Sequence, residues 1–195
     1  MELRAATWQD LEQLAEVFGR AFHGTPQWEW IIPNATARER ILPAFFRPMF
    51  GHVLKHGRLT VAIVDGSIVG GAAWLPSSKL DVPRWRGLRS FPTIIRSLRG
   101  AELKQFGERG PAMDSAARAA HPKMPHEYLA ALAVLPEAQG AGVGAALLQR
   151  GLFAPVTYVQ CEEALVPYYQ RFGFRGCLRI APGNGAPVQI GMLRD

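Results

Sequence analysis

The spacing of hydrophobic residues predicts two long helices near the start of the chain. Apolar positions recur every three or four residues over 8–22 and again over 36–55, as they do when one face of a helix is buried. Pro43 and Pro48 lie inside the second segment, where the missing backbone donor is expected to kink or split the helix. The segment 26–33 has a proline at each end and is expected to form a loop.

Shorter runs with alternating or continuous apolar character predict the strands of a sheet. Asp65-Gly66 separates two such runs and predicts a hairpin with a type I′ turn. Residues 128–134 are apolar throughout, which is typical of a buried strand. Strands are expected from residue 3 and at 58–64, 67–75, 128–134, 155–161, 175–180 and 188–193, with helices to about 152 and over 163–172.

Residues 76–125 have the least regular pattern and are expected to form an insertion with short helices near 91–99, 101–109 and 113–120. This insertion is rich in arginines, which raises the question of nucleic-acid binding. The cluster comprises Arg84, Arg86, Arg89, Arg96 and Arg99, with Trp85 and Phe91 as possible stacking platforms.

The apolar residues of the same stretch recur at helical spacing, which favours a packed helix with a solvated basic face. They are Leu88, Phe91, Ile95 and Leu98. Glu102 and Glu108 soon follow, so the basic surface is not long and unbroken. No nucleic-acid partner is therefore expected.

Three glycines at alternate positions lie between the strand at 128–134 and a run of strong helix formers. Gly140, Gly142 and Gly144 allow the backbone to turn sharply and to approach a ligand closely. The helix that follows has unpaired N–H groups and positive partial charge at its first turn. This combination predicts a site for an anion, and a phosphate is the usual occupant.

Known phosphate loops fit this segment to different degrees. A P-loop requires Lys-Ser or Lys-Thr after the glycines, and the chain has neither there. A dinucleotide-binding turn matches formally at Gly140-x-Gly142-x-x-Ala145, with Glu162 as the acidic residue about twenty positions later. Against it, residues 135–139 separate the strand from the glycines, and only about fifty residues remain for further βαβ units.

The segment resembles the acetyl-CoA loop of the GCN5-related N-acetyltransferase (GNAT) family. Gln139-x-x-Gly142-x-Gly144 corresponds to the family's Arg/Gln-x-x-Gly-x-Gly/Ala, and Val134-Leu-Pro corresponds to its lead-in. Later in the chain, the segment 167–174, Pro-Tyr-Tyr-Gln-Arg-Phe-Gly-Phe, resembles the family's closing Tyr-x-x-x-Gly-Phe element. The two elements occur in the order found in the family.

The resemblance implies an α/β fold with a mixed, mostly antiparallel twisted sheet and helices on both faces, in a single domain over residues 1–195. It also implies acetyl-CoA as the cosubstrate, with the insertion 76–125 near the acceptor site. The residues that correspond to the family's cofactor contacts are Leu132, Ala133, Val134, Gln139, Gly140, Ala141, Gly142, Val143, Gly144 and Ala145.

Acyl transfer from a thioester to an amine needs a proton donor for the thiolate and a proton acceptor for the amine. By the resemblance, Tyr169 is the donor, since an unperturbed phenol stays protonated at neutral pH. Tyr168 is the weaker candidate because it points about 100° away on a helix. At the start of the strand, Glu127 is the natural carboxylate base, with a solvated strand-end charge as the alternative.

Two shorter matches concern the acceptor. Trp74-Leu-Pro and His121-Pro-x-x-Pro-His126 resemble the members that acetylate small amines, including puromycin-type antibiotics, so a primary amine of a small molecule is expected. Residues 162–165, Glu-Glu-Ala-Leu, stand where many members carry an asparagine. This departure leaves a non-catalytic acyl-CoA-binding regulator as the alternative function.

Composition narrows the class of protein further. With 195 residues, 48% hydrophobic residues and a net charge of +6, the chain is typical of one globular domain that can bind an anionic cofactor. It lacks a membrane-length apolar run and a signal-peptide pattern, so a cytoplasmic location without membrane contact is expected. Its cysteines and histidines show no metal-ligand spacing, so no metal is expected. The oligomeric state stays open, with a homodimer as one possibility.

Overall fold

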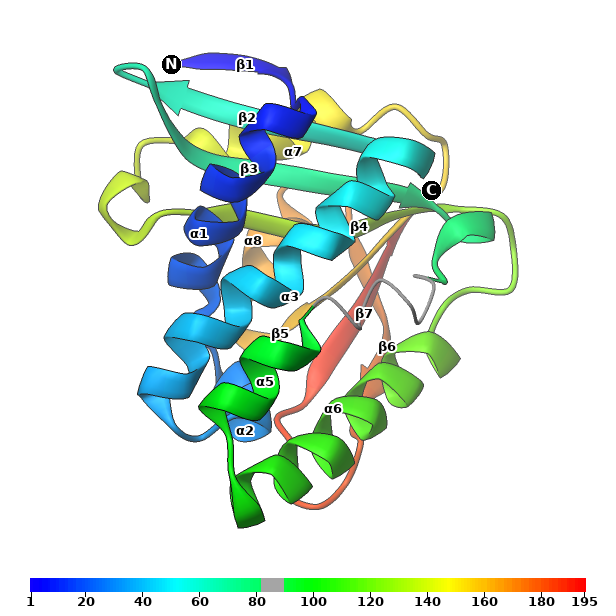
Figure 1. Ribbon diagram of the computed structural model, residues 1–195. Helices are drawn as coiled ribbons and strands as arrows, with labels where there is room; N and C mark the ends of the chain where they lie inside the picture. The colour runs from blue at the N-terminus through cyan, green and yellow to red at the C-terminus, as the bar shows by residue number, and fades with distance from the viewer. Residues whose placement is uncertain (82–89) are drawn as a thin grey trace.

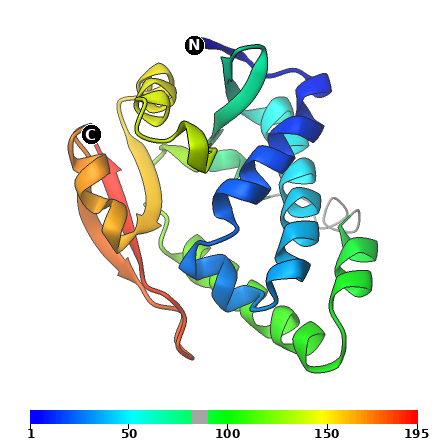
Figure 2. The same ribbon diagram turned by 90° about the vertical axis from the view of Figure 1, so that its left-hand side faces the viewer.

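A computed structural model describes residues 1–81 and 90–195. A seven-stranded sheet runs through the molecule, with helices on both of its faces (Figures 1 and 2). The strand order is β1-β2-β3-β4-β5-β7-β6, and each neighbouring pair is antiparallel except β4 and β5. The expected α/β class with a mixed, mostly antiparallel sheet is therefore confirmed.

The elements follow the hydrophobic pattern closely. The strands are β1 (Glu2–Ala5), β2 (Arg58–Val64), β3 (Ser67–Pro76), β4 (Glu127–Val134), β5 (Thr157–Glu162), β6 (Arg175–Ile180) and β7 (Gln189–Arg194). The helices of the described residues include α1 (Leu11–Phe22), α2 (Pro26–Ile31), α3 (Ala35–His56), α5 (Phe91–Ser97), α6 (Gly100–Ala119), α7 (Val143–Gly151) and α8 (Val166–Gln170). Asp65 and Gly66 have φ of 50° and 79°, and positive φ at both positions agrees with the expected type I′ turn.

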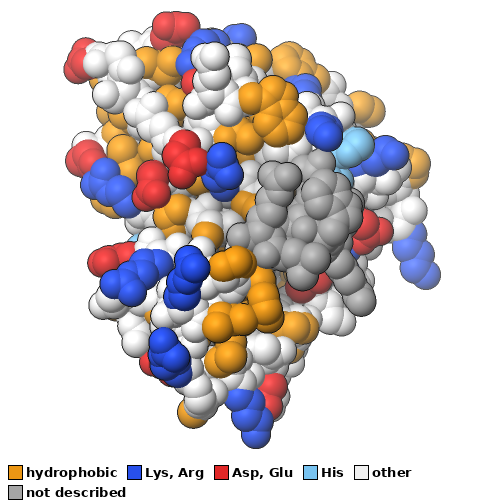
Figure 3. All heavy atoms as spheres, viewed as in Figure 1, with side chains coloured by type: hydrophobic (Ala, Val, Ile, Leu, Met, Phe, Trp, Pro, Cys, Tyr) orange, Lys and Arg blue, Asp and Glu red, His pale blue; other side chains and the backbone are white. Residues whose placement is uncertain are grey.

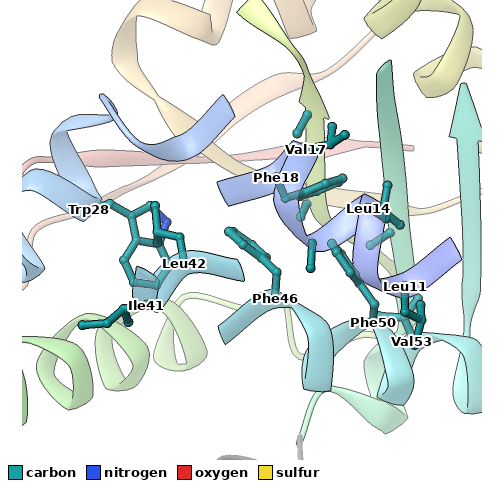
Figure 4. Packing of buried hydrophobic residues seen from close by; sticks show 14 of the residues in the cluster. Leu11, Leu14, Val17, Phe18, Trp28, Ile41, Leu42, Phe46, Phe50 and Val53 are labelled. Atoms are coloured by element: carbon teal, nitrogen blue, oxygen red, sulfur yellow. The ribbon is translucent and has the colours of Figure 1, made fainter. Parts of the chain in front are cut away.

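Each face of the sheet has its own hydrophobic cluster. On one face α1 and α3 pack over β3 and β4, and Phe18 contacts Phe46 and Phe50 with ring centroids 5.4 and 4.7 Å apart (Figure 4). On the other face α7 and α8 pack around the fully buried Trp74 of β3. These two clusters hold β4 between them, so the centre of the sheet is the most tightly fixed part of the fold.

The N-terminal half differs from the expected pattern at two points. The segment expected to be a loop contains the short helix α2, which starts with Pro26 at a position where proline costs no hydrogen bond. The helix α3 continues through Pro43 and Pro48 instead of splitting. Pro43 packs closely on α1, because a Cβ added to Gly19 would lie 2.8 Å from its ring. This contact helps to hold the helix together despite the missing donor.

The insertion also differs from its prediction. The two short helices expected after residue 100 form the single helix α6, which runs through Pro111. Contacts at both halves support it: Arg109 donates to the Trp30 carbonyl, and the Gln160 side chain donates to the Ala117 carbonyl. The expected place of the insertion near the acceptor site stays a prediction.

The inward packing expected for the helix after residue 90 is only partly present. Leu98 is buried, but Phe91 and Ile95 are 53% and 42% exposed, so that prediction is wrong for these two. Figure 3 shows hydrophobic side chains at the surface on the face that carries α5. The other residues of that prediction, Arg84, Trp85, Arg86, Leu88 and Arg89, lie outside the described residues.

The close approach of α7 to β3 leads us to predict how a side chain at Gly151 changes the stability of the protein. A Cβ at Gly151 would lie 2.2–2.3 Å from three ring atoms of Trp74. We expect Gly151→Ala to lower the free energy of unfolding by about 1–3 kcal/mol, as overpacking does, despite a gain in helix propensity. Gly107→Ala in α6 is the matched control, because a Cβ there meets nothing within 4 Å. Urea unfolding followed by circular dichroism measures both, and equal stability of the two variants contradicts the packing argument.

Candidate functional site

The two parallel strands at the centre of the sheet pair only at their beginnings. β4 and β5 pair from Glu127–Thr157 to Leu129–Val159. Beyond this point β4 continues beside β3 as far as Val134, whereas β5 continues beside β7. The two strands therefore diverge, and a V-shaped gap opens in the sheet toward the end of β4 (Figure 1).

β4 carries a bulge where the gap begins. Its register with β3 shifts between Ala73 and Trp74, which leaves Ala130 without a partner. As a result, Leu129 belongs to the cluster under α7 and α8, whereas Ala131 belongs to the cluster under α1 and α3. A bulge of this kind re-aims the residues that follow it, here the last residues of β4 along the gap.

The direction of the backbone groups along the gap follows from a backbone hydrogen bond at the end of β4. The N–H of Leu135 donates to a β3 carbonyl at 2.8 Å. Because alternate residues of a strand point their backbone groups to opposite sides, Ala133 also faces β3. Leu132 and Val134 therefore direct their backbone groups into the gap. Three residues here are expected to contact the cofactor. The backbone groups of Leu132 and Val134 face the gap, whereas those of Ala133 face β3.

The glycine loop follows directly after the gap. The Gln139 side chain donates to the Val134 carbonyl at 3.1 Å, which ties the loop to the end of β4. Gly140 and Gly142 both have φ of 80°, a conformation that favours glycine. A Cβ at either glycine would meet nothing within 4 Å, so the backbone borders open space. Ala141 between them is exposed.

The first turn of α7 faces the same open space. The first helical hydrogen bond runs from the Ala146 N–H to the Gly142 carbonyl at 3.0 Å. The preceding N–H groups, those of Val143, Gly144 and Ala145, therefore have no partner within the helix. Together with the positive end of the helix dipole, these groups form a site suited to a phosphate.

Tyr168 of α8 lies beside this turn. A Cβ built on Gly144 would be 3.1 Å from the Tyr168 hydroxyl and 3.6 Å from the Val134 side chain, so the hydroxyl borders the start of α7. This hydroxyl is buried and has no hydrogen-bond partner. Burial also raises the pKa of Tyr168. A buried hydroxyl without a partner is costly, and a ligand in the gap could provide the missing partner.

Tyr169 lies deeper, at the closed end of the gap. It is 6% exposed and belongs to the cluster that contains Leu129 and Val159, the last paired residues of β4 and β5. Its ring packs edge-on against Phe174. Burial, with nearby Cys161 and other tyrosines, raises the pKa of Tyr169, so its phenol is protonated at neutral pH.

Glu127 lies at the start of β4 but is not a free carboxylate. Both of its oxygens accept from Arg58 of β2, at 3.1 and 2.5 Å, and Arg58 also donates to the Gly151 carbonyl. Both oxygens of this carboxylate are therefore occupied by charge-assisted hydrogen bonds. The role of Glu127 as the base stays a prediction. The sequence pattern did not indicate its partner, because Arg58 is 69 residues away.

The segment that departs from the family pattern forms a single helical turn, Glu163–Leu165, before a short α8. Glu163 pairs with Arg179 of β6. Burial raises the pKa of Glu162, which is half-buried at the end of β5. The departure thus places two carboxylates where β5 ends, directly before the helix that carries Tyr168 and Tyr169.

Within the ranges that the structure describes, no three His, Cys, Asp or Glu side chains gather as metal ligands. The same part of the chain contains no helix with the length and apolar character needed to cross a membrane.

Comparison with known protein families identifies this region. Residues 110–176 match the model described as an acetyltransferase (GNAT) domain, which confirms the resemblance seen in the sequence. This range contains β4, the glycine loop, α7, β5 and α8. A comparison with curated proteins returns no match.

Solved structures share the fold over the whole chain. A Corynebacterium glutamicum protein described as histone acetyltransferase HPA2 and related acetyltransferase is 24% identical, with a TM-score of 0.72 over 98% of this chain and 94% of that protein. An N-acetyltransferase from Staphylococcus aureus is 15% identical, with a TM-score of 0.65 over 99% and 100%. A ribosomal-protein-alanine N-acetyltransferase from Brucella melitensis is 19% identical, with a TM-score of 0.50 over 100% and 99%.

The unpartnered hydroxyl of Tyr168 leads us to predict the effect of its removal on the stability of the ligand-free protein. Tyr168→Phe removes a buried polar group that has no partner, so it should leave the free energy of unfolding unchanged or raise it by about 1 kcal/mol. Tyr158→Phe is the matched control, because the Tyr158 hydroxyl donates to the Ala120 carbonyl at 2.9 Å. That variant should lose about 0.5–1.5 kcal/mol. Thermal unfolding measures both, and a clear loss in Tyr168→Phe shows that its hydroxyl has a partner.

Proposed function

Since residues 110–176 match an acetyltransferase (GNAT) domain, we propose that the protein transfers an acetyl group from acetyl-CoA to a primary amine of a small molecule. The observation that carries this proposal is the gap between β4 and β5, which opens beside a glycine loop with free N–H groups. A long, flexible cofactor with phosphates at one end and a thioester at the other suits such a site.

The residues around the gap fit the parts of acetyl-CoA. The N–H groups of Val143, Gly144 and Ala145 would hold its phosphates. The backbone groups of Leu132 and Val134, which face the gap, would bind its amide-containing arm as a neighbouring strand would. Tyr168 supports this assignment, because its buried hydroxyl lacks a partner within the protein. Bound acetyl-CoA supplies the activated acetyl group.

Tyr169 is the residue we assign as the proton donor to the departing thiolate. It lies beside the last rung of β4 and β5, where the gap is closed. Burial keeps its phenol protonated at neutral pH, which is the form that a general acid needs. Its neighbour Tyr168 borders the start of α7 and is assigned to cofactor binding instead.

The first test of the proposal is cofactor binding. In Gly142→Asp a carboxylate stands where a phosphate would bind, and a side chain is forced into a φ of 80°. Each charge-assisted hydrogen bond contributes about 1.5–3 kcal/mol, so losing two should reduce acetyl-CoA affinity at least 100-fold. Calorimetric titration of wild type and variant with acetyl-CoA and with NAD measures this. Gly66→Asp, at a hairpin glycine with φ of 79°, is the control for the conformational effect. NAD binding without acetyl-CoA binding would refute the proposal.

The second test concerns the proton donor. Tyr169→Phe should reduce turnover by about 10²–10⁴, the usual contribution of a general acid, with little change in acetyl-CoA affinity. The assay is release of the CoA thiol in the presence of a panel of primary amines. The parallel variant Tyr168→Phe should weaken acetyl-CoA binding and affect turnover less. Unchanged turnover in Tyr169→Phe removes this residue from the mechanism.

A further inference from the structure

A cavity of about 950 Å³ lies where β4 and β5 begin, at the end of these strands that is remote from the glycine loop. β4 has eight residues, so at ~3.3 Å per residue the cavity and the loop are roughly 23 Å apart. The walls of the cavity are largely apolar. They include Pro76, Leu80, Pro122, Met124, Phe153 and Pro155.

The carboxylate in the cavity wall is paired, and Lys123 adds a positive charge to the lining. Glu127 is the acidic residue among the described residues that line it, and Arg58 holds both oxygens of its carboxylate. The guanidinium of Arg58 also lies 4.8 Å from the centre of the Phe153 ring. A ligand with several positive charges would therefore find no free carboxylate on these walls. The apolar surface suits an uncharged or singly charged molecule with an apolar body.

Two histidines of the cavity form a hydrogen-bonded pair with a defined direction. The Nδ1 atom of His126 lies 2.8 Å from the Met124 carbonyl, which can only accept, so Nδ1 carries the proton. In the neutral ring, Nε2 of His126 is then an acceptor. It lies 3.0 Å from Nδ1 of His121, which must donate. The remaining nitrogen, Nε2 of His121, therefore has a free lone pair.

The orientation of this pair is held by its surroundings. The backbone N–H of His126 donates to the Ser77 hydroxyl at 3.1 Å. The ring of His121 lies 4.5 and 5.0 Å, between centroids, from the rings of Tyr128 and Tyr158. Tyr128 and Tyr158 face each other across β4 and β5, one rung before the pairing ends. His121 is thus next to the closed end of the gap as well as in the cavity.

Burial, more than any charged neighbour, keeps His121 neutral. His126 and the two tyrosines surround the ring, and Arg118 of α6 approaches it. Burial, His126 and Arg118 lower the pKa of His121 to about 4. Arg118 is itself paired with Asp81 and Asp114. At neutral pH the lone pair on Nε2 is therefore available.

We propose that this cavity binds the acceptor as an apolar monoamine, with the amine nitrogen at Nε2 of His121, and that His121 accepts the proton the amine loses. The proposal rests on the acetyl-transfer function proposed above. His126 acts through His121 and is a positioning residue. In this proposal Glu127 is not the base. Its ion pair with Arg58 neutralises the carboxylate in the cavity wall.

The reaction balances with these groups. The amine nitrogen forms a bond with the acetyl carbon, the carbon–sulfur bond breaks, and sulfur keeps the electron pair. The amine reacts in its neutral form, after the ammonium has lost one proton to solvent. One proton then moves from nitrogen to Nε2 of His121, and one moves from the Tyr169 phenol to sulfur. The products are an N-substituted acetamide and the CoA thiol. The proton on His121 then returns through solvent to the Tyr169 phenolate, which restores both groups.

The substrate class is tested with the full-length protein, acetyl-CoA and two probe amines. Benzylamine has one amine and an apolar body, whereas 1,4-diaminobutane carries two positive charges. We expect benzylamine to have a kcat/KM at least 10-fold higher, measured by thiol release and by mass spectrometry of the acetylated product. A preference for 1,4-diaminobutane, or no transfer to benzylamine by protein that binds acetyl-CoA, overturns the proposal.

The role of His121 is tested on the same substrate. His121→Ala should lower kcat by about 10²–10⁴, with an unchanged KM for acetyl-CoA, and added imidazole should restore part of the rate. His126→Gln should lower kcat less and should not respond to imidazole, because His121 is still present. The control is His23→Ala, whose ring bonds the Ala35 carbonyl and does not line the cavity. Imidazole rescue separates a lost proton acceptor from a merely structural defect.

The outcomes distinguish the two proposals. Full activity in His121→Ala, or a reduced activity that imidazole does not restore, overturns the role of His121 and leaves acetyl transfer intact. Wild-type protein that neither binds acetyl-CoA nor releases its thiol with any amine overturns the proposed function itself, and the acceptor proposal with it.

Discussion

The backbone of β4 beyond Leu129 lacks a strand partner on one side, because β5 turns away to follow β7. Buried backbone groups without partners are costly, so the protein must satisfy them in another way. The side chain of Gln139 reaches back to the Val134 carbonyl. The other groups that face the gap are available to a ligand. The break in the sheet thus lowers the stability of the free protein. It also leaves backbone groups that can pair with a ligand as they would with a neighbouring strand.

The rest of the fold keeps this gap open and at the same time rigid. The aromatic packing of α1 on α3 holds β3 and β4 from one face (Figure 4). From the other face, α7 lies so close to β3 that Gly151 leaves no room for a side chain beside Trp74. Side chains thus pack against β4 and its neighbour β3 from both faces of the sheet, beside the gap. The bulge at Ala130 then sets which side chains and backbone groups border the opening.

The two ends of β4 differ in chemistry. At the C-terminal end of β4, the glycine loop and the first turn of α7 offer N–H groups and the positive end of the helix dipole, which suit the phosphates of a cofactor. At its start, the Arg58–Glu127 ion pair and the hydrogen-bonded His121–His126 pair lie among apolar walls. Tyr169 lies between these regions, beside the last rung of the paired strands. A reaction that joins a large anionic cofactor to a small apolar amine is consistent with this division.

The sequence by itself determined the features that depend on neighbouring residues. The periods of the helices and strands, the hairpin at Asp65-Gly66 and the glycine loop are local, because spacing and φ preference are properties of a few adjacent residues. Only the tertiary structure decided the rest. The continuity of α3 through Pro43 depends on Gly19 of another helix. The two tyrosines of α8 acquire different surroundings because α7 contacts one and the end of the β4–β5 pairing borders the other. Glu127 is bound by a residue 69 positions away, and such long-range contacts leave no pattern in a single sequence.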